Sequence, residues 1–66
     1  MRILVNGEEA DSRGARNIAE LVDRFQMSPQ SILIEHNGVA LHPREWPQRS
    51  LGEGDRIEIV RVVAGG

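Results

Sequence analysis

The segment that decides the fold is Asn-Ile-Ala-Glu-Leu-Val-Asp-Arg-Phe, residues 17–25. Four of its apolar residues recur with helical spacing: Ile18, Leu21, Val22 and Phe25. This i, i+3, i+4, i+7 pattern places them on one face of an α-helix. Asn17 can cap the first turn, and Glu20 follows it at the capping-box distance. The segment therefore predicts an amphipathic helix that covers an apolar surface.

A β-hairpin is predicted before this helix. The segment Arg2-Ile3-Leu4-Val5, which is apolar after its first residue, runs into Asn6-Gly7. This dipeptide favours a type I′ turn, which needs positive φ at both central positions. The return segment, residues 8–12, is short and polar, as is typical of an edge strand whose charges discourage aggregation.

Further strands are predicted after the helix. Residues 31–37 alternate, with Ile32 and Ile34 on one face and Leu33 and Glu35 on the other. A second Asn-Gly turn then leads to a short strand at 39–41. One helical turn follows between prolines, and we expect its Trp46 to fill the core beneath it.

The last predicted strand covers residues 56–63. Ile57 and Ile59 alternate cleanly, but the apolar pattern then moves to Val60, Val62 and Val63. A β-bulge near Val60 would explain this change of phase.

The order of hairpin, helix, strand, short connection and strand indicates a two-layer α+β fold. We expect a small mixed sheet with the one amphipathic helix packed on one face. The first and last strands are the most apolar, so they should be central neighbours. A chain of 66 residues fits a single domain, residues 1–66, with 63–66 as a flexible C-terminal reactive tail.

Composition excludes several classes of function. All eight basic residues are Arg, and with ten acidic residues they give a net charge of −2. This balance of charge gives no strongly positive potential that would bind the phosphate backbone of a nucleic acid. The absence of cysteine excludes a disulfide scaffold and a thiol nucleophile. No apolar run approaches the ~20 residues that span a bilayer, so we expect no membrane contact and a cytoplasmic location.

No catalytic or metal-binding constellation is present in the sequence. His36 and His42 are separated by a turn and lack a third ligand at metal spacing, so both are expected to be surface or turn residues. The serines lack an activating base in their surroundings. We therefore expect no metal site, and a protein that is not itself an enzyme.

The remaining feature is the C-terminal pair Gly65-Gly66, which follows directly on a strand. An extended tail from residue 63 reaches ~13–14 Å, enough to enter a cleft in a partner protein. A carboxylate without nearby Cβ atoms can be approached from several sides. It must be converted to an acyl-adenylate before a sulfur nucleophile can replace AMP. Separate enzymes would have to supply ATP and the sulfur donor.

At this point the sequence resembles the ThiS family. The similar motifs are residues 1–7 (MRILVNG), 34–38 (IEHNG), 43–46 (PREW), 54–57 (GDRI) and 62–66 (VVAGG). They cover essentially the whole chain in the right order. The resemblance implies a β-grasp (ubiquitin-like) fold and the role of a sulfur carrier for the thiazole ring of thiamin.

The resemblance also implies partners and roles for particular residues. A ThiF-like enzyme would adenylate Gly66, sulfur would come from cysteine through a desulfurase, and thiazole synthase (ThiG-like) would accept it. ATP would be consumed by the adenylating enzyme, with no cofactor bound here. Gly65 and Gly66 match the reactive tail. The stalk that enters partner clefts would be Arg61, Val62, Val63 and Ala64.

For docking we expect an apolar patch at Val60 and Val62, extended by Leu33 or Leu41, on a chain that is monomeric when free. These valines could equally be core residues. Three alternatives to the thiazole role remain open: a sulfur carrier of the molybdopterin or cysteine type, a ubiquitin-like protein modifier, and a plain interaction module.

Overall fold

The computed structural model describes residues 1–62. The elements are β1 (Arg2–Val5), β2 (Glu8–Asp11), α1 (Ile18–Arg24), η1 (Pro29–Ser31), β3 (Ile32–His36), β4 (Val39–Leu41), η2 (Pro43–Gln48) and β5 (Arg56–Arg61), where η marks a 3₁₀ helix. Their order is the one that the sequence predicts. The expected tail, residues 63–66, lies outside the described residues.

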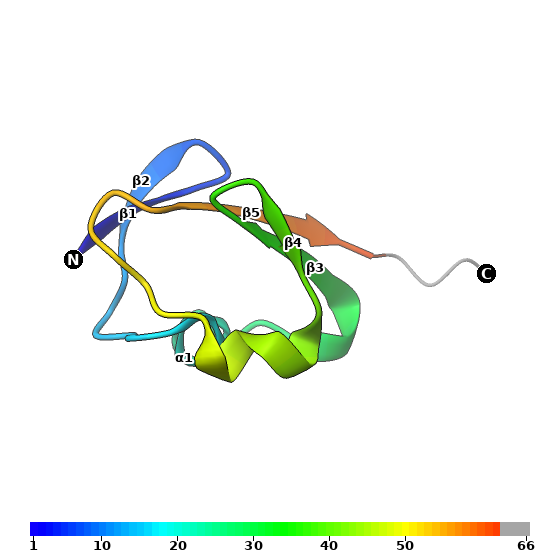
Figure 1. The fold of residues 1–66 in the computed structure, drawn as a ribbon. Helices are drawn as coiled ribbons and strands as arrows, with labels where there is room; N and C mark the ends of the chain where they lie inside the picture. The colour runs from blue at the N-terminus through cyan, green and yellow to red at the C-terminus, as the bar shows by residue number, and fades with distance from the viewer. Residues whose placement is uncertain (63–66) are drawn as a thin grey trace.

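The five strands form one mixed sheet in the order β2-β1-β5-β3-β4. β1 and β5 run parallel, and the other neighbours are antiparallel. The first and last strands are therefore neighbours inside the sheet, and β2 lies at an edge, as predicted. Figure 1 shows α1 and η2 together on one side of the sheet. This arrangement confirms the α+β prediction.

Both Asn-Gly dipeptides form the predicted tight turns. Asn6 and Gly7 have φ of 51° and 82°, and Asn37 and Gly38 have 51° and 85°. The first turn is also tied to β5. The Asn6 side chain donates to the Ile59 carbonyl over 3.2 Å and accepts from the Ile59 N–H over 2.7 Å. The β1–β2 hairpin is therefore held against the strand that leads to the tail.

The helix begins as the capping signal predicts. The Asn17 side chain accepts from the Glu20 N–H over 2.8 Å. The Glu20 carboxylate reaches one residue further back than in a standard capping box, to the Arg16 N–H over 2.8 Å. α1 buries Ile18, Leu21 and Val22 against the sheet.

The core lies between the sheet and the helices. Its buried apolar residues are Ile3, Ala15, Ile18, Leu21, Val22, Ile32, Ile34, Leu41, Trp46, Leu51 and Ile57. Trp46 is only 4% exposed, which confirms the prediction that η2 carries it into the core.

The predicted bulge near Val60 is wrong. β3 and β5 pair without interruption, with Ile34 opposite Ile59, Leu33 opposite Val60 and Ile32 opposite Arg61. Alternation therefore continues to the end of β5. Because Ile57 and Ile59 face the core, alternation turns Val60 to the outer face and places Arg61 on the core side.

Candidate functional site

The chain leaves the sheet from a paired strand end. Arg61 lies opposite Ile32, and the backbone N–H of Val62 donates to the Ser31 carbonyl over 2.7 Å. Two of the expected stalk residues are thus held by backbone contacts: Arg61 pairs with β3, and Val62 is hydrogen-bonded to Ser31, the last residue of η1. Val63, Ala64, Gly65 and Gly66 lie outside the described residues, and their roles stay predictions.

An apolar patch lies beside this strand end on the outer face. Leu33 is 59% exposed, Val60 57% and Val62 45%. Leu33 and Val60 are directly opposite each other on β3 and β5. These three residues, here called the outer patch, confirm that the valines are exposed and not core. Leu41 does not extend the patch, because it pairs with Ile34 on the core face and is buried.

The outer face becomes charged away from the tail. Glu35 and Glu58 are both exposed and lie directly opposite each other on β3 and β5. Like charges in this position are destabilising. Arg56 precedes Glu58 by two residues on the same face, and the three side chains border a shallow depression together with Gly38. Along β3 and β5, the outer face is therefore apolar at the tail end and charged at the other end.

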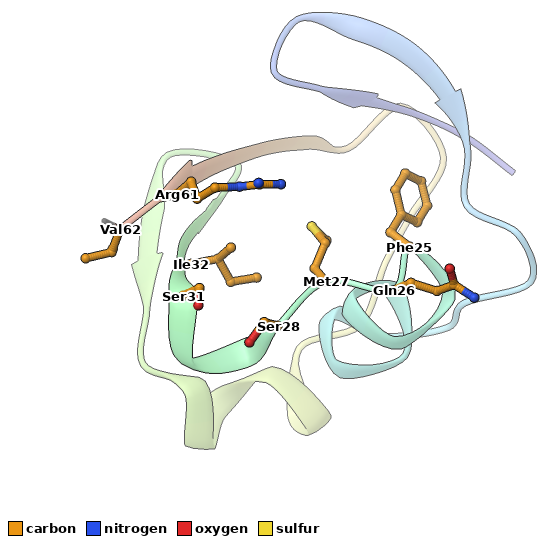
Figure 2. A pocket seen from close by; sticks show the side chains of 8 residues that line it. All are labelled: Phe25, Gln26, Met27, Ser28, Ser31, Ile32, Arg61 and Val62. Atoms are coloured by element: carbon orange, nitrogen blue, oxygen red, sulfur yellow. The ribbon is translucent and has the colours of Figure 1, made fainter. Parts of the chain in front are cut away.

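A cleft of about 410 Å³ opens on the other side of the strand end. It is lined by Phe25, Gln26, Met27, Ser28, Ser31, Ile32, Arg61 and Val62. Figure 2 shows Met27 and Ile32 pointing into it, with the Arg61 side chain extending from β5 across its opening. We call this feature the tail-base cleft.

The wall of the cleft is built where α1 ends. Gln26 has φ of 55°, a left-handed conformation that closes the last helical turn. Its N–H donates to the Asp23 carbonyl over 3.0 Å, and the Met27 N–H donates to the Val22 carbonyl over 3.1 Å. The chain turns away from the helix axis at this point. Met27 consequently faces the strand end instead of continuing the helix.

His36 is buried, contrary to the expectation of a surface or turn residue. Its Nε2 lies 2.7 Å from Asp55 Oδ2, and its Nδ1 accepts from Arg49 Nε over 2.9 Å. Because Arg49 donates to Nδ1, the proton of the neutral ring is on Nε2, from which it donates to Asp55. His36 follows Ile32 and Ile34 on the inward face of β3, so the alternation itself carried the signal of its burial.

Asp55 is the centre of this polar cluster. It also accepts from the Gly52 N–H over 2.7 Å and from Asn37 Nδ2 over 3.1 Å. Burial of the carboxyl raises its pKa, but the hydrogen bonds from His36, Gly52 and Asn37 outweigh burial, so the pKa of Asp55 lies below its usual value. The cluster joins the end of β3 to the loop between η2 and β5, and its contacts give it a structural role.

The other expectations concern His42, metals and membranes. His42 is exposed and precedes η2, where its N–H donates to Glu45 Oε1 over 2.6 Å, as expected of a turn residue. Within residues 1–62, no three His, Cys, Asp or Glu side chains gather closely enough to hold a metal ion. No helix in the described part of the chain is both long and apolar enough to cross a bilayer.

A model of the ThiS family matches residues 3–66, almost the whole sequence. The chain belongs to the ThiS family. Members of this family are sulfur carriers and not enzymes, and the membership places this chain among them. The match spans both the described fold and the C-terminal residues on which the sequence prediction depends.

Two solved structures of a ThiS protein share the fold. The crystal structure of a thiamine biosynthesis protein (ThiS) from Geobacter metallireducens is 26% identical, with a TM-score of 0.83 and full coverage of both chains. An NMR structure of a thiamine biosynthesis protein from the same organism gives 26% identity and a TM-score of 0.80, over 100% of this chain and 88% of the other. The β-grasp prediction is therefore confirmed.

Two curated relatives are also similar. An uncharacterized protein, ycf40, from Trieres chinensis is 27% identical over 62 residues, which cover 94% of this chain and 85% of the relative. A thiazole synthase from Paramagnetospirillum magneticum is 24% identical over 66 residues. This second match covers the whole of the present chain but only 20% of the relative.

Proposed function

We propose that this ThiS-family chain carries sulfur on its C-terminal Gly66, as a thiocarboxylate, and delivers it to a thiazole synthase in thiamin biosynthesis. Membership of the family supports the carrier role. The observation that favours this acceptor is the relative named thiazole synthase, which contains a segment similar to the whole of this chain.

The chemistry requires two steps, the activation of the carboxylate and the replacement of AMP by sulfur. A carboxylate resists nucleophiles, so an oxygen of Gly66 first attacks the α-phosphate of ATP and displaces pyrophosphate. A sulfur nucleophile at the oxidation level of sulfide then attacks the acyl carbon and displaces AMP, which leaves a thiocarboxylate. A ThiF-like enzyme would bind ATP and catalyse adenylation. A cysteine desulfurase would take the sulfur of cysteine as a persulfide, and a thiol reductant, itself oxidised to a disulfide, would bring that sulfur to the sulfide level. ATP is a substrate of the ThiF-like enzyme, so the carrier itself needs no cofactor.

The residues at the end of β5 would present the reacting group. The pairing of Arg61 with β3 and the hydrogen bond from the Val62 N–H to the Ser31 carbonyl hold the base of the tail. In the proposal Val63 and Ala64 complete the stalk that enters the partner. Gly65 gives the reacting carboxylate a neighbour without Cβ, which lets ATP and then sulfur approach it.

The outer patch would be the surface that docks on the partners. Leu33, Val60 and Val62 expose apolar atoms next to the start of the tail, where a partner that receives the tail must also make contact. The patch has only these three side chains, which suits short-lived complexes. A carrier must leave the adenylating enzyme before it meets the sulfur acceptor, and in this proposal the free chain is a cytoplasmic monomer.

Reconstitution tests the proposal. The chain is incubated with ATP, a ThiF-like enzyme, a cysteine desulfurase, cysteine, a thiol reductant and a thiazole synthase with its other substrates, and thiazole formation is measured. We expect thiazole to form with the wild type and to be lost when Gly66 is deleted. Sulfur transfer to a molybdopterin precursor instead of thiazole would reassign the acceptor. Attachment of the chain to lysines of other proteins would indicate a protein modifier.

A further inference from the structure

We propose that the tail-base cleft is a second docking site, which binds a partner segment carrying an apolar side chain next to an aspartate or glutamate. The inference rests on the proposed function, because it concerns the enzymes that receive the tail. It adds a contact on the helix side of β5, on the face opposite Leu33 and Val60, and Val62 at the strand end borders both surfaces.

The floor of the cleft suits an apolar side chain. Met27 and Phe25 are only partly buried against the core, and Ile32 closes the inner end. A volume of about 410 Å³ falls in the ~300–1,000 Å³ range of sites that enclose small ligands, so there is room for one or two side chains. A partner side chain placed here would continue the core where the chain itself leaves it open.

The charge of the cleft is set by Arg61, the one charged side chain that residues 1–62 contribute to its lining. Ile57 and Ile59 precede it on the core side of β5, and the next position on that side holds a guanidinium. With residues 1–62, Arg61 makes neither an ion pair nor a side-chain hydrogen bond. A guanidinium presents N–H groups in a fork that matches a carboxylate. Charge complementarity therefore assigns an acidic residue to the occupant.

A second arginine near the cleft is already engaged. The Arg13 guanidinium lies 4.2 Å from the centroid of the Phe25 ring, and Arg13 Nη1 donates to the Arg24 carbonyl over 3.3 Å. These contacts hold Phe25 as a fixed wall. Among the described residues near the cleft, Arg61 is thus the cation left to bind an incoming carboxylate.

The cleft and the outer patch lie on opposite faces of the end of β5. Arg61 faces the cleft, whereas Val60 on the same strand points to the opposite face and belongs to the outer patch. A partner that grips both faces of β5 would fix the direction of the strand end, and with it the direction of the tail. Docking through the outer patch alone would leave the whole domain free to tilt on the partner. The cleft would therefore orient Gly66 in the partner's active site.

The main competing occupant is the chain's own terminal carboxylate. To reach Arg61, the chain would have to reverse direction just after Val62. The residues that turn most readily, Gly65 and Gly66, come only at the very end of the sequence. The sequence thus favours an external carboxylate, and the experiment below separates the two.

Binding without ATP tests the site apart from the chemistry. The Kd for the ThiF-like enzyme is measured by titration calorimetry for wild type, Arg61→Ala, Arg61→Lys and Arg61→Glu. Arg44→Glu is the matched control, because Arg44 is exposed on η2 and lies outside the cleft lining. We expect Arg61→Ala to weaken binding about tenfold and Arg61→Glu more, with partial retention in Arg61→Lys. Ser28→Trp, which places a bulky side chain at the rim, should also weaken binding.

Each outcome decides the inference. Equal affinities for wild type and Arg61→Glu, or no affinity of the enzyme for the wild type, would overturn it. The chain's own carboxylate is tested by measuring the free energy of unfolding of the free chain with Arg61→Ala, with a C-terminal amide, and with both changes. If each change lowers that free energy and the two effects are not additive, the chain's own carboxylate occupies the cleft, and the inference is wrong. Arg61-dependent binding without adenylation of Gly66 would support the cleft while refuting the proposed function.

Discussion

Replacement of Asp55 by alanine should strongly destabilise the fold, because its carboxylate is the centre of the polar cluster around His36. Its carboxylate accepts from His36 Nε2, from the Gly52 N–H and from Asn37 Nδ2. The substitution leaves the buried His36 N–H without an acceptor, which costs about 1–3 kcal/mol. Water can reach the other two donors, and their loss adds about 1 kcal/mol together.

The total loss of about 2–4 kcal/mol is large for this chain. A folded chain of this size has a free energy of unfolding of roughly 3–10 kcal/mol. Urea unfolding at pH 7, followed by the fluorescence of the single buried Trp46, measures the change. With an m-value of about 1 kcal/mol/M, the urea midpoint should fall by about 2 M or more.

A matched control separates the cluster from a general loss of charge. Asp23 has a side chain that is 81% exposed and pairs only with its neighbour Arg24. Asp23→Ala should therefore change the free energy of unfolding by less than about 0.5 kcal/mol. If Asp55→Ala were no more destabilised than Asp23→Ala, the reasoning on the His36 cluster would be refuted.

Four further outcomes are expected. The folded pKa of Asp55 lies below the ordinary value of about 3.9, so the carboxylate stabilises the fold above that pH and stops doing so as the pH falls through the folded pKa. The difference in free energy of unfolding between wild type and Asp55→Ala should therefore narrow from pH 5 to pH 2 in urea titrations. A constant difference would contradict this. Asn17→Ala removes the cap of α1 and should cost about 1 kcal/mol in the same assay, and an unchanged midpoint would show that the cap is not needed. Ile57→Ala leaves a cavity at a fully buried position and should cost about 2–5 kcal/mol, so a loss under 1 kcal/mol would mean that the core refills the space. Leu33→Asp should leave thermal stability nearly unchanged but weaken binding to the ThiF-like enzyme about tenfold, whereas undiminished affinity would remove the outer patch from the interface.

The elements were predictable because their signals are local. An Asn-Gly dipeptide forms a tight turn through its own backbone preference, and Asn6-Gly7 has the positive φ angles that the turn demands. The stripe of α1 depends on residues within two helical turns. The parallel pairing of β1 with β5 is long-range, but the apolar character of both strands was enough to place them together.

The polar cluster and the strand end were not predictable in this way. His36 is buried because Arg49 and Asp55, 13 and 19 residues away, satisfy both ring nitrogens. The alternation of β3 places His36 on the inward face, but no window along the sequence shows which residues satisfy its ring nitrogens. At the end of β5, the sequence left open whether Val60 and Val62 belong to the core or to an exposed patch. The pairing of β5 with β3 turns Val60 outward, which creates the outer patch and leaves Arg61 over the cleft.

The central claim concerns a single atom at Gly66, and intact mass spectrometry tests it most directly. The chain is purified from its host, and its mass is compared with that of a Gly66 deletion variant prepared in the same way. The account predicts a fraction of the wild type heavier by the replacement of one oxygen with sulfur, located at Gly66 by fragmentation and absent from the variant. A wild-type mass that stays that of the free carboxylate, even after incubation with ATP, the ThiF-like enzyme and a sulfur donor, would contradict it.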